Sequence, residues 1–369
     1  MARGVVVVYF SRLGRKLRTD QELMLVANAK DLARIKHYDF GGTYREGHSY
    51  SGHVYFVPED TLLLDEALHL GIRGPDDLYG GVVPYPFAKT KAITHQLVDD
   101  HAERPDGWSS AFAEQVRNVV LPGYTVFSAH DAKAAAERII SRTAVRVKAP
   151  LATGGKGQAL VTSVEELDAF VKDVPADDIA TYGLVLEENL QQVRTLSIGH
   201  ITVDKLTITY HGTQRFTTDN DGRSVYGGSD LVCVRGGWGA LDRLSMTDKT
   251  RVGVAEAKLY DEAMHEYPGF VASRRNYDVG QGVDSKGRRR SVVFESSWRI
   301  GGATSAEIMA LTEFTRDPSV HVVEASHVEK YGSNRKAPPR AVTHFQGDDP
   351  EVGPMIRYTL VTRMQRRPI

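Results

Sequence analysis

The chain has 369 residues, of which 41% are hydrophobic and 25% are charged, close to the averages of ordinary globular proteins. This composition excludes a disordered chain, a collagen-like chain and a coiled coil, and the net charge of −1 carries no signature of binding to nucleic acid or to an anionic membrane. The single cysteine, Cys233, excludes an intrachain disulfide and a zinc site built from several cysteines, and we expect a reducing, cytoplasmic location.

The first quarter of the sequence predicts strands and helices in alternation. The apolar run over 5–10 is β-branched and aromatic and is too short for a membrane span or a signal-peptide core, so we predict a buried strand. Apolar residues at helical spacing predict a helix over 20–35, followed by a strand and turn over 54–63 and a short helix over 63–72. We therefore predict a small α/β unit over residues 1–88.

The middle of the chain contains the clearest helix signals. Ser128 is a good N-cap, and Ser163 with Glu166 forms a capping-box pattern. The predicted elements are a helix over 88–100, a loop with a short helix over 102–123, strands over 124–127, 145–150, 159–162 and 183–190, and helices over 132–140 and 164–172.

The last part of the chain predicts antiparallel strands. Apolar and polar residues alternate over 196–216, which is typical of strands with one solvated face. Glycines and aromatic residues over 217–240 indicate irregular loops around a cavity. The other predicted elements are a helix over 250–267, strands over 270–279 and 291–294 joined by a basic turn over 280–290, and a helix over 305–314, with no element assigned after it.

A lysine and a glycine-rich loop are the first candidates for phosphate binding. Lys148 lies near the end of the strand predicted over 145–150, and the loop Gly154-Gly155-Lys156-Gly157 follows it. Glycines let backbone amides approach phosphate oxygens closely, and a lysine adds a positive charge. The loop matches neither GxxxxGK[ST] nor GxGxxG, so a hairpin turn and an edge lysine are the alternatives.

Acidic residues near strand ends are the second group of candidates. Glu187 and Glu188 close the strand predicted over 183–190, where they form either a ligand-binding edge or a solvated turn.

Glu295, Ser297 and Arg299 share one face of a strand because side chains alternate with a period of two. With Asp278 on the neighbouring strand they are candidates for a Mg²⁺–phosphate site, and the alternative is a surface ion pair between Arg299 and Glu295.

In order and spacing these pieces resemble the ATP-grasp superfamily. The matching runs read VRVKAP, TGGKGQ, VLEENL, YDVGQGVDSKG and VVFESSWRIGG, and PFAKTKAITHQL resembles the stretch that opens the grasp. The resemblance covers residues 55–315, and the whole chain also looks like an uncharacterised bacterial family of ATP-grasp-like proteins.

The resemblance implies an α/β (α+β) ATP-grasp fold. It places a pre-ATP-grasp domain over 1–88, a lysine and glycine-loop subdomain over 89–195, and a metal-binding subdomain over 196–315. Residues 316–369 form a C-terminal segment to which it assigns no role.

The resemblance also implies the site residues and the ligands, ATP and Mg²⁺, with Mn²⁺ as a substitute. Arg299 and Lys148 would act on the transferring group. The nucleotide would contact Lys91 (with Lys89 as second choice), Lys148, Gly154, Gly155, Lys156, Gly157, Glu187, Glu188, Asn189 and Leu190, and the metal would contact Asp278, Glu295 and Ser297.

The chain departs from the superfamily pattern at three places. Ser297 stands where an asparagine usually follows the metal glutamate, which puts a second metal site in doubt. Arg194 aligns with a ribose-binding carboxylate, for which Gln191 or Gln192 are substitutes. Asp284 competes with Asp278 as the metal aspartate.

The implied activity is an ATP-dependent ligase for small molecules, which activates a carboxylate as an acyl phosphate for attack by an amine or a similar nucleophile. A nucleotide-binding regulatory protein is the alternative, which Ser297 favours, and a homodimer is the expected assembly on base rates. A Rossmann oxidoreductase is disfavoured because no GxGxxG follows the first strand.

Overall fold

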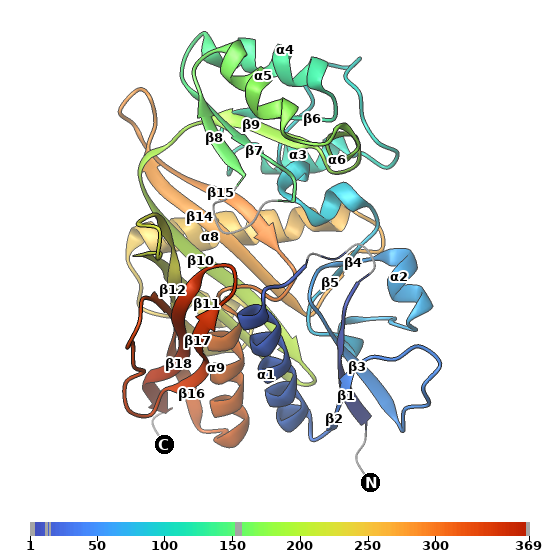
Figure 1. Ribbon diagram of the computed structural model, residues 1–369, viewed down its shortest axis with the longest axis vertical. Helices are drawn as coiled ribbons and strands as arrows, with labels where there is room; N and C mark the ends of the chain where they lie inside the picture. Colours follow the sequence, from blue (N-terminus) through green and yellow to red (C-terminus); the bar gives the residue numbers. More distant parts are fainter. Residues whose placement is uncertain (1–3, 12–13, 15, 152–156, 367–369) are drawn as a thin grey trace.

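A computed structural model describes residues 4–11, 14, 16–151 and 157–366 of the chain. Figure 1 shows an N-terminal unit, a small lobe at the top of the view, and a large central sheet that the C-terminal strands complete. Within the described residues, no helix is both long enough and apolar enough to cross a membrane.

The N-terminal unit is built on a parallel sheet in the order β2-β1-β3. Residues 4–8 are all buried, as expected for a central parallel strand covered on both faces, and helix α1 packs beside it. The strand predicted over 5–10 and the helix predicted over 20–35 are confirmed. The elements are β1 (Gly4–Tyr9), α1 (Thr19–Lys36), β2 (Asp39–Thr43), β3 (His53–Pro58), β4 (Leu62–Leu63), α2 (Leu64–His69), η1 (Pro75–Asp77) and β5 (Gly81–Val83).

The connector after this unit corrects one prediction. The helix predicted over 88–100 is wrong, because the segment forms two 3₁₀ turns, η2 (Pro86–Lys89) and η3 (Lys91–Thr94). Thr90 between them is extended, and its hydroxyl accepts the amide of Ala92 and so caps η3. Helix α3 (Ser110–Val116) follows.

The small lobe is a four-stranded antiparallel sheet in the order β6-β9-β7-β8, with helices α4 and α5 packed together on it. Both predicted N-caps are confirmed, since the hydroxyls of Ser128 and Ser163 accept amides three residues on. The elements are β6 (Gly123–Val126), α4 (Ala129–Ile140), β7 (Val145–Lys148), β8 (Gln158–Val161), α5 (Val164–Lys172), α6 (Ala176–Tyr182) and β9 (Leu184–Glu188).

The large sheet is antiparallel throughout, in the order β15-β14-β10-β11-β12-β16-β18-β17. Its last three strands come from the C-terminal segment that the sequence left unassigned. The elements are β10 (Gln191–Val203), β11 (Leu206–Thr218), β12 (Ser224–Arg235), α7 (Trp238–Asp242), α8 (Asp248–Ala263), η4 (Met264–Glu266), β13 (Val271–Ala272), β14 (Arg274–Val283), β15 (Arg289–Ser297), α9 (Thr304–Arg316), β16 (Val320–Tyr331), β17 (Val342–Asp349) and β18 (Gly353–Arg366).

Strand β12 corrects the prediction of irregular loops over 217–240. It pairs with β11 on one side and with β16 on the other, so it is a central strand. Its glycines serve close packing: a Cβ atom on Gly228 would lie 2.1 Å from the carbonyl oxygen of His327. The glycines that suggested a loop therefore permit close strand contact.

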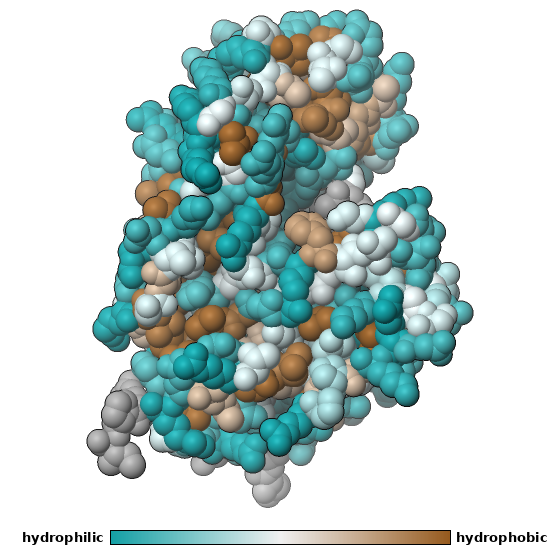
Figure 2. Space-filling view, turned by 90° about the vertical axis from the view of Figure 1, so that its left-hand side faces the viewer, coloured by the Kyte–Doolittle hydropathy of each residue, from teal (hydrophilic) through white to brown (hydrophobic). Residues whose placement is uncertain are grey.

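The two faces of the large sheet have different coverings. Helix α8 packs on β10, β14 and β15. Helix α9 packs on β11, β12, β16 and β18, and it also contacts α1. The strands alternate so that Asp278 and Glu295 lie on the face of the sheet opposite to α8. In the space-filling view a notch separates the small lobe from the body (Figure 2).

Candidate functional site

Two directly paired carboxylates form the centre of the candidate site. Asp278 on β14 and Glu295 on β15 are partners in the antiparallel register, so their side chains project from the same face of the sheet. Burial, together with the negative charge of Glu295, raises the pKa of Asp278 to about 7. Because the negative charges of two neighbouring carboxylates repel each other, the pair favours a bound cation or a proton.

A lysine from the connector neutralises part of this charge. Nζ of Lys91 on η3 lies 3.1 Å from Oε2 of Glu295, and the lysine side chain is 7% exposed. Desolvation by itself would raise the pKa of Glu295, but the ammonium groups of Lys91 and Lys148 hold this pKa below its usual value. Glu295 is therefore a carboxylate anion facing two lysines.

The second lysine belongs to a buried group of three side chains in the small lobe. Nζ of Lys148, at the end of β7, lies 2.5 Å from Oε1 of Glu187 on β9. Nε2 of His95, which follows η3, lies 3.1 Å from Oε2 of the same carboxylate. Burial by itself would raise the pKa of Glu187, but Lys148 and His95 lower it to about 2. Glu187 is thus ionised, and each of its two oxygens has one donor.

A β-bulge brings Phe294 into the same region. The register of β14 and β15 shifts next to Asp278, and the ring of Phe294 covers Gly280, where a Cβ atom would meet it at 1.9 Å. Nζ of Lys148 lies 5.1 Å from the centroid of this ring and 3.4 Å from the carbonyl oxygen of Phe294. Phe294 also packs with Leu121, Leu190 and Val292, which form a small apolar surface beside the link between β9 and β10.

Arg299 lies at the border with the N-terminal unit. Its Nε lies 3.7 Å from Oδ1 of Asp60, and Nζ of Lys89 lies 3.1 Å from Oδ2 of the same carboxylate. The positive charge of Arg299 also opposes the rise in the pKa of Asp278. Lys89, the second choice for the nucleotide lysine, is therefore tied to the N-terminal unit, whereas Lys91 lies at the carboxylate pair.

Ser297 is held by an arginine. Its hydroxyl accepts a hydrogen bond of 3.4 Å from Nη1 of Arg274, which also donates to the carbonyl oxygens of Ser297 and Arg299. Asn276 stands opposite Ser297 on β14, and its amide nitrogen donates to Ser197 and Tyr210. Ser297 lies on the carboxylate face, but its hydroxyl already has a cationic donor.

The remaining predicted residues occupy varied positions. Gly154, Gly155 and Lys156 lie outside the described residues, and Gly157 adopts a positive φ of 63° before β8. Asn189 accepts two hydrogen bonds from Arg146. Glu188 is half-buried at the end of β9, Leu190 is buried beside Phe294, and Gln191, Gln192 and Arg194 are exposed at the start of β10.

The structure distinguishes the two candidate metal aspartates. Asp284 lies in the turn between β14 and β15, where it accepts amides of Lys286 and Arg288 and pairs with the Arg288 side chain. Asp278 instead faces Glu295, and its Oδ1 is a buried oxygen with no hydrogen-bond partner in the described part of the chain. The geometry therefore favours Asp278.

The donor set fits a hard divalent cation. Within the described residues, no group of three or more His, Cys, Asp or Glu side chains is arranged to hold a metal. Two adjacent carboxylates, one with an unsatisfied buried oxygen, match Mg²⁺, which takes one or two protein carboxylates and completes its shell with water and substrate phosphates. The residues Asp278 and Glu295 would hold such an ion.

Sequence reasoning missed His95 and Phe294. His95 lies within the helix that the sequence predicts over 88–100. The one sequence signal for it is its position four residues after Lys91. Phe294 read as an ordinary strand residue, because a bulge depends on the pairing of two strands and leaves no pattern in one of them.

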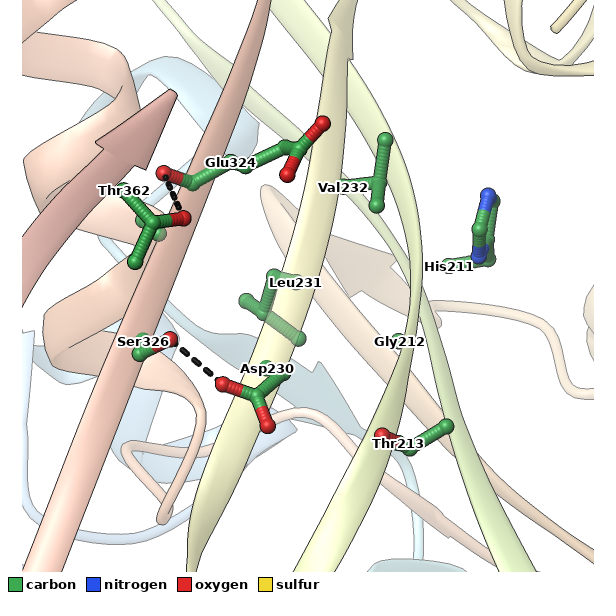
Figure 3. A pocket seen from close by; sticks show the side chains of 10 residues that line it. His211, Gly212, Thr213, Asp230, Leu231, Val232, Glu324, Ser326 and Thr362 are labelled. Carbon is green, nitrogen blue, oxygen red and sulfur yellow. Dashed lines mark hydrogen bonds between the residues drawn. The ribbon is translucent and has the colours of Figure 1, made fainter. Parts of the chain in front are cut away.

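A separate shallow cavity of about 280 Å³ lies on the other face of the large sheet. Side chains from β11, β12, β16 and β18 line it, and the hydroxyl of Ser326 donates to Asp230 there (Figure 3). His211 at its edge has a buried ring nitrogen without a partner among the described residues, and burial lowers the pKa of this imidazole. The cavity contains none of the predicted site residues.

The chain has the ATP-grasp fold, as solved structures that match nearly its whole length show. The model of the family described as "Protein of unknown function (DUF3182)" matches residues 14–359, so the chain belongs to that family. None of the curated proteins shows significant sequence similarity to it.

Solved structures with the same fold include three enzymes of similar length. The N5-carboxyaminoimidazole synthetase of Staphylococcus aureus, complexed with ADP, is 12% identical, with a TM-score of 0.57 over 98% of this chain and 94% of the other. The biotin carboxylase of Campylobacter jejuni is 11% identical, with a TM-score of 0.52 over 98% and 88%. The N5-carboxyaminoimidazole synthase of Aspergillus clavatus, with ADP and 5-aminoimidazole ribonucleotide, is 10% identical, with a TM-score of 0.52 over 97% and 94%.

Proposed function

We propose that the chain is a Mg²⁺-dependent, ATP-consuming ligase that joins a small-molecule carboxylate to an amine or a similar nucleophile. One observation carries the proposal: two buried lysines from separate segments converge with the Asp278–Glu295 pair. Lysine ammonium groups and a carboxylate-held divalent ion are the groups that bind and polarise a triphosphate. The solved structures with this fold that contain ADP support the same ligand.

Each residue has a definite task in this proposal. Lys91 and Lys148 would neutralise phosphate oxygens. Asp278 and Glu295 would hold Mg²⁺, which would supply further positive charge to the bound triphosphate. Arg299 contacts the transferring phosphoryl group. Leu190 and Phe294 provide an apolar surface for the base, and backbone groups near Glu188 provide its polar contacts.

The chemistry then depends on positioning and charge stabilisation. A carboxylate oxygen of the substrate attacks the γ-phosphorus, ADP leaves, and the acyl phosphate loses inorganic phosphate when a nucleophile attacks its carbonyl carbon. The side chains supply no covalent intermediate; they hold the reacting groups and stabilise the developing charge. One well-placed cation in such a site is worth roughly 3–4 kcal/mol, on the order of 10²–10³ in rate.

The test is phosphate release from MgATP with pools of candidate carboxylates and amines, together with calorimetric titration of ADP. We expect Lys148→Ala to keep the folded structure but to lower turnover on the order of 10²–10³ and to weaken ADP binding. Lys172→Ala, on the exposed surface of α5 in the same lobe, is the matched control. Unchanged affinity and turnover in Lys148→Ala would remove Lys148 from the site.

A nucleotide-binding regulatory protein is the second candidate. The engagement of the Ser297 hydroxyl by Arg274 favours it, because it leaves fewer free oxygen ligands for a second metal ion. Tight ADP binding with no phosphate release from any substrate pool, even with Mn²⁺ in place of Mg²⁺, would support this candidate over the ligase.

A further inference from the structure

Glu187 is a buried carboxylate with two donors of different kinds. The Lys148 ammonium reaches one oxygen and the His95 imidazole the other, and all three side chains are at most 5% exposed. A carboxylate only accepts hydrogen bonds, so Nε2 of His95 carries the hydrogen and Nδ1 is the nitrogen that can take another proton. The charges of the Lys148 ammonium and the Glu187 carboxylate cancel each other.

Nucleotide binding disturbs this balance. Under the proposed function, the Lys148 ammonium turns toward a phosphate oxygen, and Glu187, whose side chain is 4% exposed, loses its counter-charge. An unpaired buried charge is strongly unfavourable. We infer that His95 takes up a proton when the nucleotide binds, so that an imidazolium replaces the ammonium as the partner of Glu187, an inference that rests on the proposed function.

The other titratable groups around His95 cannot supply the positive charge that Glu187 needs. Lys91, on η3, is paired with Glu295 of β15. Tyr260, on α8, hydrogen-bonds Thr94, and burial raises the pKa of its phenol to about 12, so it remains neutral. Among these groups, contributed by η3, β7, β9, β15 and α8, the imidazole is the one that contacts Glu187 and can gain a charge.

His95 is therefore a positioning residue. It keeps the Glu187 carboxylate in place while Lys148 moves between the carboxylate and the phosphate. The proton comes from solvent and binds Nδ1, and no covalent bond between heavy atoms forms or breaks. Nucleotide affinity consequently rises as the pH falls, by at most about tenfold per pH unit for one linked proton.

Proton uptake can be measured by isothermal titration of the full chain with ADP at pH 7, in two buffers of different ionisation enthalpy. EDTA in the buffers removes divalent ions, and any proton exchange at the Asp278–Glu295 pair is the same in wild type and variant, so it cancels in their comparison. His95→Gln retains an N–H donor toward Glu187 but cannot take up a proton, so we expect it to bind ADP within a few fold of wild type. We expect less proton uptake in this variant than in the wild type.

The matched control is His130→Gln, because the His130 side chain is 90% exposed and lies on α4 of the same lobe. Its proton uptake should equal that of the wild type. Equal uptake by the wild type and His95→Gln would overturn the inference while leaving nucleotide binding intact. Failure of the wild type to bind ADP, with or without Mg²⁺, would instead contradict the proposed function.

A second measurement needs no variant. In the wild-type protein labelled with ¹³C at the histidine Cε1 positions, we expect saturation with ADP to move the pH midpoint of one buried histidine upward. If every histidine keeps its midpoint or moves downward, the inference is wrong, whatever the folding behaviour of His95→Gln.

Discussion

The immediate neighbours of each carboxylate in the site set its proton affinity. Glu187 would be difficult to keep as an anion in the interior, yet Lys148 and His95 together hold its pKa near 2. Asp278 experiences the opposite balance, since burial and Glu295 raise its pKa to about 7. Two carboxylates of the candidate site thus have different proton affinities, which is a common property of functional sites.

The low pKa of Glu187 predicts acid sensitivity. A carboxyl group whose pKa falls from 4.5 to about 2 on folding stabilises the protein above pH 4.5, and this contribution disappears as the pH falls through about 2. We expect the loss to be on the order of 3 kcal/mol. Denaturant unfolding at pH 5, 4 and 3 should therefore show a steep decline in wild type and a shallower one in Glu187→Gln.

The matched control for this experiment is Glu188→Gln, since Glu188 is the next residue on β9. Its profile should follow that of the wild type. Parallel profiles for wild type and Glu187→Gln would contradict the role given to the buried ion pair.

The raised pKa of Asp278 predicts pH-dependent metal binding. Because a proton and a cation compete for this carboxylate, Mn²⁺ affinity should fall by up to about tenfold per pH unit below pH 7 and level off above it. Electron paramagnetic resonance of free Mn²⁺ between pH 5.5 and 8.5 measures this. Asp278→Asn should bind Mn²⁺ weakly at every pH, whereas Asp284→Asn should behave as wild type, and the reverse order would assign the metal to the turn.

At the scale of secondary-structure elements, the break between η2 and η3 is what separates two lysines. Thr90 is extended, and its hydroxyl bonds the carbonyl oxygen of Phe87 and the amide of Ala92. As a result Lys89 reaches Asp60 in the N-terminal unit, and Lys91 reaches Glu295 in the large sheet. A continuous helix would have placed the two lysines about 200° apart on one cylinder, without this cap.

Removal of the Thr90 hydroxyl should therefore affect binding as well as stability. We expect Thr90→Val, which keeps the shape of the side chain, to lower the free energy of unfolding by about 1–2 kcal/mol and to weaken ADP binding severalfold. Thr90→Ser keeps the hydroxyl and serves as the control. Denaturant unfolding and ADP titration measure the two effects, and a variant that loses stability with unchanged ADP affinity would show that the cap does not position Lys91.

At the scale of the whole molecule, one buried carboxylate joins the N-terminal unit to the large sheet. Glu307 on α9 accepts from Nε and Nη2 of Arg274 on β14, from Tyr79 after η1 and from Tyr210 on β11. All four side chains are buried, so this network holds β14, which carries Asp278, against β11, α9 and the N-terminal unit. The small lobe, at the top of Figure 1, contributes Lys148 from β7 and Glu187 from β9.

Sequence patterns determined the parts of this protein that depend on near neighbours. Strand β1, the capped helices α4 and α5, and the positions of Lys148 and Glu187 near strand ends all follow from local spacing, because periodicity and capping involve residues only a few positions apart. The ordered set of weak motifs was also enough to indicate the ATP-grasp fold, which the structural neighbours show.

Tertiary structure decided everything that depends on distant segments meeting. The Lys91–Glu295 pair, the His95–Glu187 contact, the bulge at Phe294 and the central position of β12 each require two strands or turns that are remote in the chain. The glycines of β12 were ambiguous for the same reason, since a glycine permits both a loop and a close strand contact. The charge balance of a buried site depends on which side chains the folded chain brings together, so it cannot be read from any single segment of the sequence.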